Sequence, residues 1–216
     1  ALANNSVCYT DKPDGETFLR EWTSLVESKS GERGIFNRTS AKEQAKKFGR
    51  RDADHEFGTN PCSEIILRPY QFCNLTEVVI REKDKFEDLK RKVMLATILG
   101  TAQATLTKFP YLRKVWKTNT EEERLLGVSL TGIMDNELTS GKKNGLDKTL
   151  TALREIAVET NKEWSAIFGI PQSTAITCVK PSGTVSQLVD SSSGIHPRHS
   201  SYYIRTVRGD NKDPLT

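Results

Sequence analysis

The sequence contains few cysteines and no long apolar segment. Only 4 of its 216 residues are cysteine, too few for the disulfide framework of a small secreted domain. The longest apolar stretch, at 93–99, is short and follows three cations at 90–92, which excludes a membrane-spanning helix. The chain opens without the basic and apolar segments of a secretion signal, so we predict a cytoplasmic protein with no membrane partner.

Signatures of metal and nucleotide sites are scarce as well. The three histidines, His55, His196 and His199, form no H-x-x-x-H helix pattern. Cysteines that bind zinc as a pair are usually about two to four residues apart, whereas Cys73 follows Cys62 after a much longer interval, so we predict no metal site. The chain has no G-x-x-x-x-G-K-[ST] motif, which excludes a P-loop.

Charge and composition are those of an ordinary folded domain. The 32 lysines and arginines nearly balance the 28 aspartates and glutamates, and this mild net charge of +4 gives no indication of a nucleic-acid partner. Hydrophobic residues make up 36% of the chain, which is enough for a buried core. No internal repeat or linker divides the sequence, so we treat 1–216 as a single domain.

Strands are expected to alternate with long helices. Apolar residues at helical spacing predict helices at 17–29, 86–102, 121–136 and 147–168, with a shorter solvated basic helix at 41–47. Asp84 is placed to cap the second of these. Short apolar or β-branched runs predict strands at 62–67, 76–81 and 174–179. The alternation predicts an α/β architecture.

The first group of chemically active residues is Asn60-Pro-Cys62-Ser-Glu64, followed by Cys73. In an extended chain, residues two apart point to the same side, so Cys62 and Glu64 can face one site. Two alternatives stay open. Cys62 can be a small buried hydrophobic residue, or it can form a disulfide with Cys73 if their Cα atoms lie within about 7 Å. Cys8 and Cys178 are predicted to be structural.

The second group, Pro181-Ser-Gly-Thr184 with Ser186, follows the strand expected at 174–179. Small hydroxyl residues and glycine let backbone N–H groups approach a phosphate, so this segment is a candidate anion site. An ordinary turn has the same composition and remains the alternative.

Taken together, these motifs resemble the large subunits of ribonucleotide reductases. The resemblance is closest to the adenosylcobalamin-dependent (class II) branch, in particular its monomeric ribonucleoside-triphosphate reductases. The short interval between Cys62 and Cys73 is similar to that branch, since the iron-dependent enzymes carry an insertion there. The motifs that carry the resemblance lie in one order along the chain, at 60–65, 72–75, 127–132, 180–184 and 193–198.

The resemblance implies a role for each of these residues. Cys62 matches the cysteine at the tip of a finger loop inside a ten-stranded α/β barrel, whose thiyl radical takes the 3′ hydrogen of the ribose. Glu64 matches the carboxylate that accepts the 3′-hydroxyl proton, and Asn60 matches an amide that binds the sugar. Cys73 matches one of two thiols that form a redox-active disulfide, and Cys8 is a weak candidate for the other. The substrate phosphates would be held by Pro181, Ser182, Gly183, Thr184 and Ser186.

The resemblance also implies the ligands. It predicts adenosylcobalamin as cofactor, a ribonucleoside triphosphate as substrate, thioredoxin or a similar dithiol as reductant and a deoxynucleotide as a possible allosteric ligand. Reductases of this family supply deoxyribonucleotides for DNA replication and are much longer, so we expect 1–216 to be a partial catalytic barrel domain that is inactive alone. The alternatives are a nucleotide-binding regulatory module without catalysis, or an iron-dependent or glycyl-radical reductase.

Overall fold

The computed structural model describes residues 6–29, 34–204, 206, 209, 211–212 and 214. Helices and strands alternate along much of this part of the chain, which confirms the predicted mixture of α and β structure. In chain order the elements are β1 (Ser6–Tyr9), α1 (Gly15–Ser28), β2 (Gly34–Asn37), α2 (Arg38–Lys46), β3 (Gly58–Thr59), β4 (Ile66–Leu67), β5 (Asn74–Val79), α3 (Phe86–Gln103), α4 (Lys114–Glu123), β6 (Leu126–Thr131), η1 (Ile133–Asp135), α5 (Leu146–Phe168) and α6 (Val185–Leu188).

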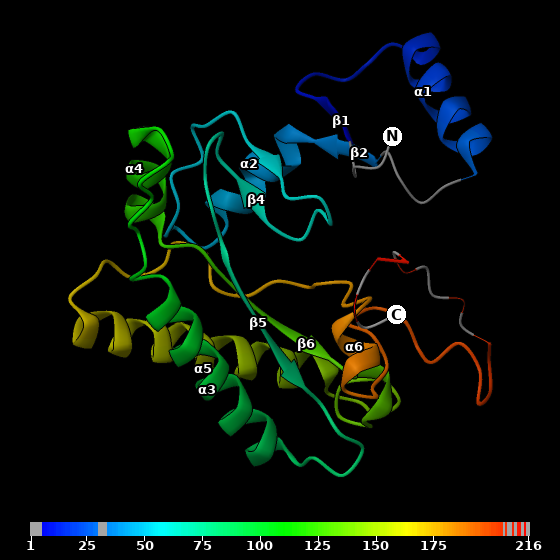
Figure 1. Ribbon diagram of the computed structural model, residues 1–216, viewed down its shortest axis with the longest axis vertical. Coiled ribbons are helices and arrows are strands. Elements are labelled where there is room, and N and C mark those ends of the chain that lie inside the picture. The colour runs from blue at the N-terminus through cyan, green and yellow to red at the C-terminus, as the bar shows by residue number, and fades with distance from the viewer. Residues whose placement is uncertain are drawn as a thin grey trace.

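Two parallel strands form the centre of the fold (Figure 1). β5 and β6 pair from Asn74 with Leu126 to Val79 with Thr131. A third segment joins the free side of β6 through one parallel bridge between Val128 and Thr177. The helices α3 and α5 pack against each other and α3 packs on both strands, which buries one face of this small sheet.

The two faces of the central strands have different chemistry, because successive side chains point to opposite sides. Val78 of β5 and Leu126 and Val128 of β6 are buried in the main hydrophobic cluster with residues of α3 and α5. The alternate positions carry Glu77 and Ser129, a directly opposed pair in the strand register. The sheet therefore has an apolar face under the helices and a polar face that is available to a functional site.

The helices at 86–102 and 147–168 are confirmed by α3 and α5, whose bounds differ by only a residue or so. The cap of α3 differs from the prediction. Lys85 occupies the N-cap position, while the Asp84 carboxylate accepts a hydrogen bond of 2.8 Å from the amide of Arg81 and pairs with Lys92. Asp84 thus stabilises the turn before the helix and not the helix end itself.

The predicted helix at 121–136 is wrong. The helix α4 ends at Glu123, Arg124 adopts the left-handed conformation, and the chain then forms the strand β6. Leu126, Val128 and Leu130 alternate with Gly127, Ser129 and Thr131, which is the period of a strand. The predicted helix followed apolar residues across the end of α4, β6 and η1 as if they were one element, and so missed this alternation.

The other strand predictions hold only in part. The strand expected at 76–81 is β5, which begins two residues earlier, at Asn74. The strand expected at 62–67 shrinks to the two residues of β4, and 174–179 contributes an isolated bridge and no named strand. These short segments are held by contacts with distant parts of the chain, which local sequence does not encode.

Two N-terminal helices differ in how they are buried. The helix α1 matches the prediction at 17–29 and connects β1 to its parallel partner β2. None of its residues is buried, and Leu19 and Trp22 are 61% and 53% exposed. The helix α2, expected to be solvated, buries Ala41 and Ala45 against Phe57. Its basic residues lie on the remaining surface, so the expectation holds for one face only.

A glycine in β6 permits the close approach of three segments. A Cβ atom on Gly127 would lie 2.9 Å from Ile65 Cδ1 and 3.1 Å from Cys178 Sγ, and it would also overlap Leu75. Gly127 therefore lets the segment after β3 and the segment after α5 pack directly on the polar face of the sheet.

Replacing this glycine should be costly. We expect Gly127→Ala to destabilise the fold by about 1–3 kcal/mol, because the surrounding side chains must shift to admit a methyl group. The check is the urea midpoint of the complete gene product that carries these residues. Gly15→Ala is the matched control, since nothing lies within 4 Å of a Cβ at Gly15. Equal midpoints for the two variants would contradict the close packing.

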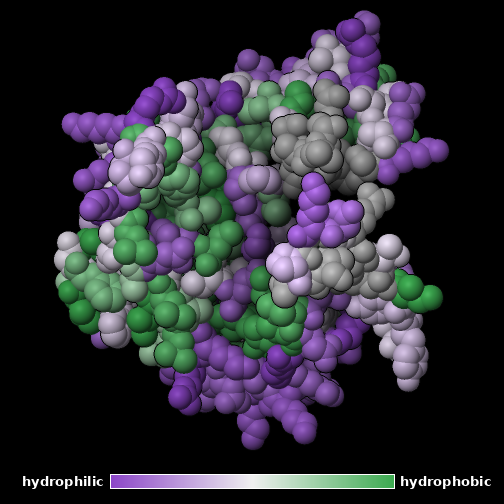
Figure 2. Space-filling view, in the orientation of Figure 1, coloured by the Kyte–Doolittle hydropathy of each residue, from purple (hydrophilic) through white to green (hydrophobic). Residues whose placement is uncertain are grey.

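Hydrophobic side chains also reach the surface. Figure 2 shows apolar residues gathered on the visible face among a largely hydrophilic periphery. On α3, Leu95 and Leu99 are 51% and 66% exposed. Even so, none of the helices in the described part of the chain combines the length and apolar character that crossing a membrane requires.

Candidate functional site

Cys62 lies at the tip of a hairpin. β3 and β4 pair antiparallel, and the six residues between them close a tight turn. The Asn60 side chain holds this turn, since its Oδ1 accepts a 3.0 Å hydrogen bond from the amide of Ile65. Ser63 adopts a left-handed conformation with φ of 61°. Cys62 is exposed, so the alternative of a buried hydrophobic cysteine is wrong.

Glu64 turns back from the hairpin tip into the protein. Its side chain has no exposed surface, and its Oε1 atom accepts a 2.9 Å hydrogen bond from Lys180 Nζ. The other carboxylate oxygen, Oε2, is buried and has no hydrogen-bond partner. One oxygen is therefore held by a cation, while the other is buried without a hydrogen-bond partner.

The surroundings of Glu64 favour its ionised form. Burial by itself would raise the pKa of this carboxyl group. The hydrogen bond from Lys180, together with hydrogen bonds from the Glu64 amide and the Asn60 side chain, outweighs burial and lowers the pKa below its usual value. A buried carboxylate that stays ionised can accept a proton at neutral pH.

Cys73 and Cys178 lie near the same carboxylate. Cys73 directly precedes β5, and Cys178 follows the bridge to β6. Burial and the negative charge of Glu64 raise the pKa of both thiols, that of Cys178 to about 12. Both are neutral thiols at physiological pH. The sequence predicted Cys178 only as a structural strand residue. Its position near Glu64 follows from the bridge between Thr177 and Val128 of β6, which local sequence does not reveal.

Cys8 stands apart from this group. It is an exposed residue of β1, which pairs with β2 and not with the central strands. Cys8, predicted to be structural, is therefore a strand residue that is not buried, and its position gives no support to a pairing with Cys73. All four cysteines have free thiols in the structure.

The segment at 180–186 is a loop that leads into α6, and hydrogen bonds of two serine hydroxyls hold its shape. Ser182 Oγ donates a 2.7 Å hydrogen bond to Glu77 Oε2 and accepts one of 2.8 Å from Thr131. Ser186 Oγ donates to the carbonyl of Ser182. Both serines are buried, whereas Gly183 and Thr184 are exposed. Five residues were predicted to bind phosphate. Two of them, Ser182 and Ser186, use their hydroxyls in hydrogen bonds that stabilise the loop.

A cavity of about 1000 Å³ opens beside this loop. Pro181, Gly183 and Ser186 line one part of it, and Arg198 lies in its wall. The Arg198 guanidinium is engaged by two carboxylates, with Nη1 at 2.8 Å from Asp190 Oδ1. The space is large enough for a nucleotide-sized ligand, and its charged wall was not anticipated from the sequence.

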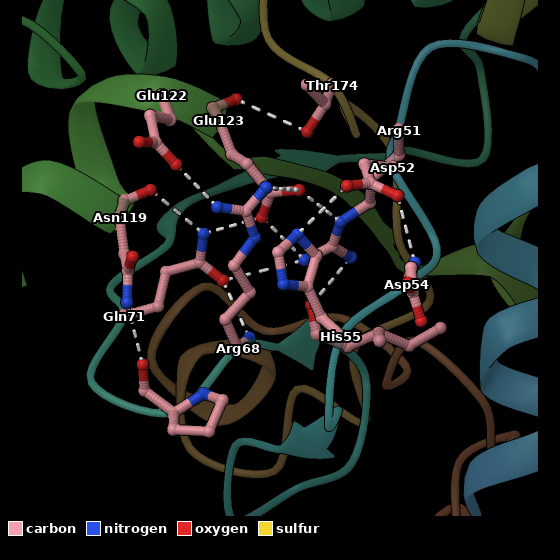
Figure 3. A network of polar contacts seen from close by, with 12 residues as sticks. Arg51, Asp52, Asp54, His55, Arg68, Gln71, Asn119, Glu122, Glu123 and Thr174 are labelled. Carbon is pink, nitrogen blue, oxygen red and sulfur yellow. Dashed lines mark hydrogen bonds and ion pairs between the residues drawn. The ribbon is translucent and has the colours of Figure 1, made fainter.

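A buried polar network holds the base of the hairpin (Figure 3). Arg51, which precedes the hairpin, makes two hydrogen bonds of 2.8 Å to the carboxylate of Glu123 at the end of α4. Gln71, which follows it, donates to the same carboxylate at 2.6 Å, and Arg68 lies 3.4 Å from it. Glu123 therefore clamps the chain on both sides of Cys62.

Sequence reasoning named the residues of the hairpin and the loop but missed their link. Lys180 stands at the head of the 180–184 motif, yet its contact with Glu64 spans 116 positions of sequence. Glu77 and Thr131, which hold Ser182, were missed for the same reason. The only feature of the sequence that pointed to a role for Lys180 was its place as a charged residue in the 180–184 motif.

No protein-family model matches the chain. Comparison with curated proteins, however, finds relatives that share one enzyme name. An adenosylcobalamin-dependent ribonucleoside-triphosphate reductase of Lactobacillus gasseri is 30% identical over 99% of this chain and 32% of its own length. The enzyme of the same name from Lactobacillus delbrueckii subsp. bulgaricus is 32% identical over 76% of this chain and 25% of its own. A probable enzyme of this name from Dictyostelium discoideum is 32% identical over 70% of the chain.

The fold agrees with the sequence comparison. The crystal structure of a B12-dependent (class II) ribonucleotide reductase superposes with a TM-score of 0.65 and 25% identity, over 89% of this chain and 30% of the other. The agreement of sequence and fold thus places the chain in the class of ribonucleotide reductases. Within that class, the chain belongs to the adenosylcobalamin-dependent family. It spans about a fifth to a third of the length of the relatives it matches.

Proposed function

We propose that this chain forms the radical hairpin and the substrate loop of an adenosylcobalamin-dependent ribonucleoside-triphosphate reductase. The observation that carries the proposal is the exposed thiol of Cys62 at a hairpin tip, two residues from the buried carboxylate of Glu64. We further propose that 1–216 is a single partial domain of a ten-stranded α/β barrel and that the hairpin is its central finger. The parallel pairing of β5 and β6 and the exposed apolar residues of α3 support this arrangement.

The residues of the hairpin divide the first step between them. The Cys62 thiyl radical takes the hydrogen atom from C3′ of the ribose and becomes a thiol, while a carbon radical forms on the sugar. Glu64 accepts the 3′-hydroxyl proton at its free Oε2. Asn60 shapes the turn through its Oδ1, while its amide nitrogen, which donates to Glu64 in the structure, is proposed to bind the sugar.

Reduction at C2′ requires two electrons from cysteine thiols. One thiol gives its proton to the 2′-hydroxyl, which leaves as water, and the hydrogen of the other thiol goes to C2′, so the two sulfurs become a disulfide. Glu64 then returns its proton to the 3′-oxygen, and the hydrogen on Cys62 returns to C3′. Cys73, half-buried near Glu64, supplies one of these thiols. The disulfide must be reduced before the next turnover, so an external dithiol of the thioredoxin type is the proposed partner.

The position of Cys62 also fits the proposed cofactor. Its thiol is exposed at the hairpin tip, so a large group can approach it from outside the fold. When bound, adenosylcobalamin supplies the radical that oxidises this thiol. The hairpin turn keeps the sulfur in place through the backbone bonds of Asn60 and Ser63.

The substrate is proposed to be a ribonucleoside triphosphate, bound with its phosphates against Gly183 and Thr184. These residues are exposed, and the fixed shape of the loop presents them next to the cavity. A deoxynucleotide effector and a cytoplasmic location are proposed with it, as the family resemblance implies.

The test is deoxynucleotide formation by the complete gene product. We expect product from a ribonucleoside triphosphate and a dithiol only when adenosylcobalamin is added, with no added iron. Product without this cofactor would assign another radical generator. Nucleotide binding without product under any of these conditions would favour a regulatory module.

A further inference from the structure

Lys180 joins the two halves of the proposed site. Its side chain is 23% exposed, and its Nζ atom lies 2.9 Å from Oε1 of Glu64, whose side chain is completely buried. Glu64 belongs to the hairpin, and Lys180 begins the substrate loop. An ion pair that is largely withdrawn from water is stronger than a surface pair, and it fixes the geometry of both partners.

The main chain of Lys180 is itself held firmly. Its amide donates a 3.0 Å hydrogen bond to Ser129 Oγ on the polar face of β6. Its carbonyl oxygen packs so closely on Gly194 that a Cβ there would overlap it. Because both the amide and the carbonyl of Lys180 are held, the fold fixes the direction in which its side chain points toward Glu64.

The pair leaves the Glu64 carboxylate asymmetric. Oε1 accepts from Lys180, while Oε2 is buried without a partner. A buried acceptor without a donor is costly, so its persistence indicates that a donor arrives from a ligand. A hydroxyl of the substrate sugar is a donor of the right kind.

We propose that Lys180 is the positioning residue for Glu64: it holds Oε1 and so presents Oε2 to the 3′-hydroxyl of the substrate. The inference rests on the proposed function, because it names the device that prepares the proposed base. Lys180 does not touch the reacting atoms. Its place at the head of the substrate loop also links the position of the base to the loop that holds the phosphates.

Other ionisable groups around the pair do not replace Lys180. The pKa of Cys73 and of Cys178 is raised, so both thiols are neutral. Burial lowers the pKa of Lys180, but its bond to Glu64 outweighs burial and raises it, so the ammonium persists. Glu77 is occupied by Ser182. A cavity of about 360 Å³ at Glu64 is also lined by three arginines, Arg50, Arg51 and Arg154. Among the charged groups, Lys180 is the one that lowers the pKa of Glu64, and Arg51 is bonded to Glu123.

The first measurement reads the base directly. Carbon-13 labelled glutamate, with Glu64→Gln to assign the signal, gives the titration midpoint of Glu64 in the complete gene product. We expect the midpoint to rise in Lys180→Met, because the burial remains while the cation is lost. Lys180→Arg should keep it low. An unchanged midpoint in Lys180→Met overturns the proposal, whether or not the protein reduces nucleotides.

The second measurement is the pH profile of turnover. We expect Lys180→Met to lower kcat by about 100-fold at acidic pH, since ionisation of the base limits the rate, with recovery as the pH rises. KM should change little. Lys180→Arg should restore most of the rate, and Lys162→Met, which removes a surface cation paired with Glu159, should match the native protein.

The outcomes separate the two proposals. A native protein without activity contradicts the proposed function, while the Glu64 titration still decides the role of Lys180. A native protein with activity and a superimposable Lys180→Met profile overturns the positioning role alone. Lys180→Gln repeats both measurements if circular dichroism shows that Lys180→Met does not fold.

Discussion

Replacing Cys62 by serine is expected to abolish deoxynucleotide formation, with a loss of more than about 10⁴-fold, because no neighbouring group can replace the reacting atom. A serine O–H bond is much stronger than a cysteine S–H bond, so serine cannot carry the radical. Cys62 is exposed at a hairpin tip and packs into no core, so the fold should be unchanged. The measurement is chromatographic detection of the deoxynucleotide under conditions in which the native protein turns over.

Two further readouts make this result specific. Binding of the ribonucleoside triphosphate should persist in Cys62→Ser, since the substrate loop at 180–186 is untouched. Ser63→Ala, the adjacent exposed position, should retain activity, because the hydrogen bond of its hydroxyl is with Thr59 in the hairpin stem and not with the residues of the proposed chemistry. Turnover that survives Cys62→Ser would show that the radical assignment is wrong.

Replacing Glu123 by glutamine is expected to loosen the hairpin by about 3 kcal/mol, because it leaves the buried charge of Arg51 without its partner. The Glu123 side chain is only 1% exposed and binds both Arg51 and Gln71. Glutamine has nearly the same shape, so the effect reports the lost charge. Hydrogen exchange measures it locally, as a lower free energy of opening for the amides of Ile65 and Arg68.

A surface substitution of the same type is the control. Glu159→Gln removes an ion pair with Lys162 that is largely exposed, and it should change stability by less than about 0.5 kcal/mol. Similar exchange in both variants would mean that the Glu123 network does not hold the hairpin.

The same network predicts a dependence on acid. Burial raises the pKa of Glu123, but hydrogen bonds and charge from Arg51 outweigh burial and lower it. A pKa that is lower in the folded than in the unfolded protein stabilises the fold above the unfolded value. This contribution should be lost as the pH falls through the folded pKa.

Long helices were predictable because their signal is local. α3 and α5 repeat apolar residues over many turns, and only one arrangement buries such a stripe. The strand β6 was taken for a helix although its apolar residues alternate with small or polar ones, because the apolar spacing was followed across the end of α4, β6 and η1 as one element. Its pairing with β5 and the bridge to Thr177 decide its conformation.

The sequence by itself determined which chemical groups the site contains. Asn60, Cys62 and Glu64 lie within five consecutive positions, so a single turn brings them together, and the order of the motifs identified the family. Only the tertiary structure decided their partners. The contacts of Lys180 with Glu64, of Ser182 with Glu77 and of Arg51 with Glu123 join residues separated by 72 to 116 positions. Such pairs form because the packing of α3 and α5 on the central strands fixes where each segment ends, and no local pattern records that geometry.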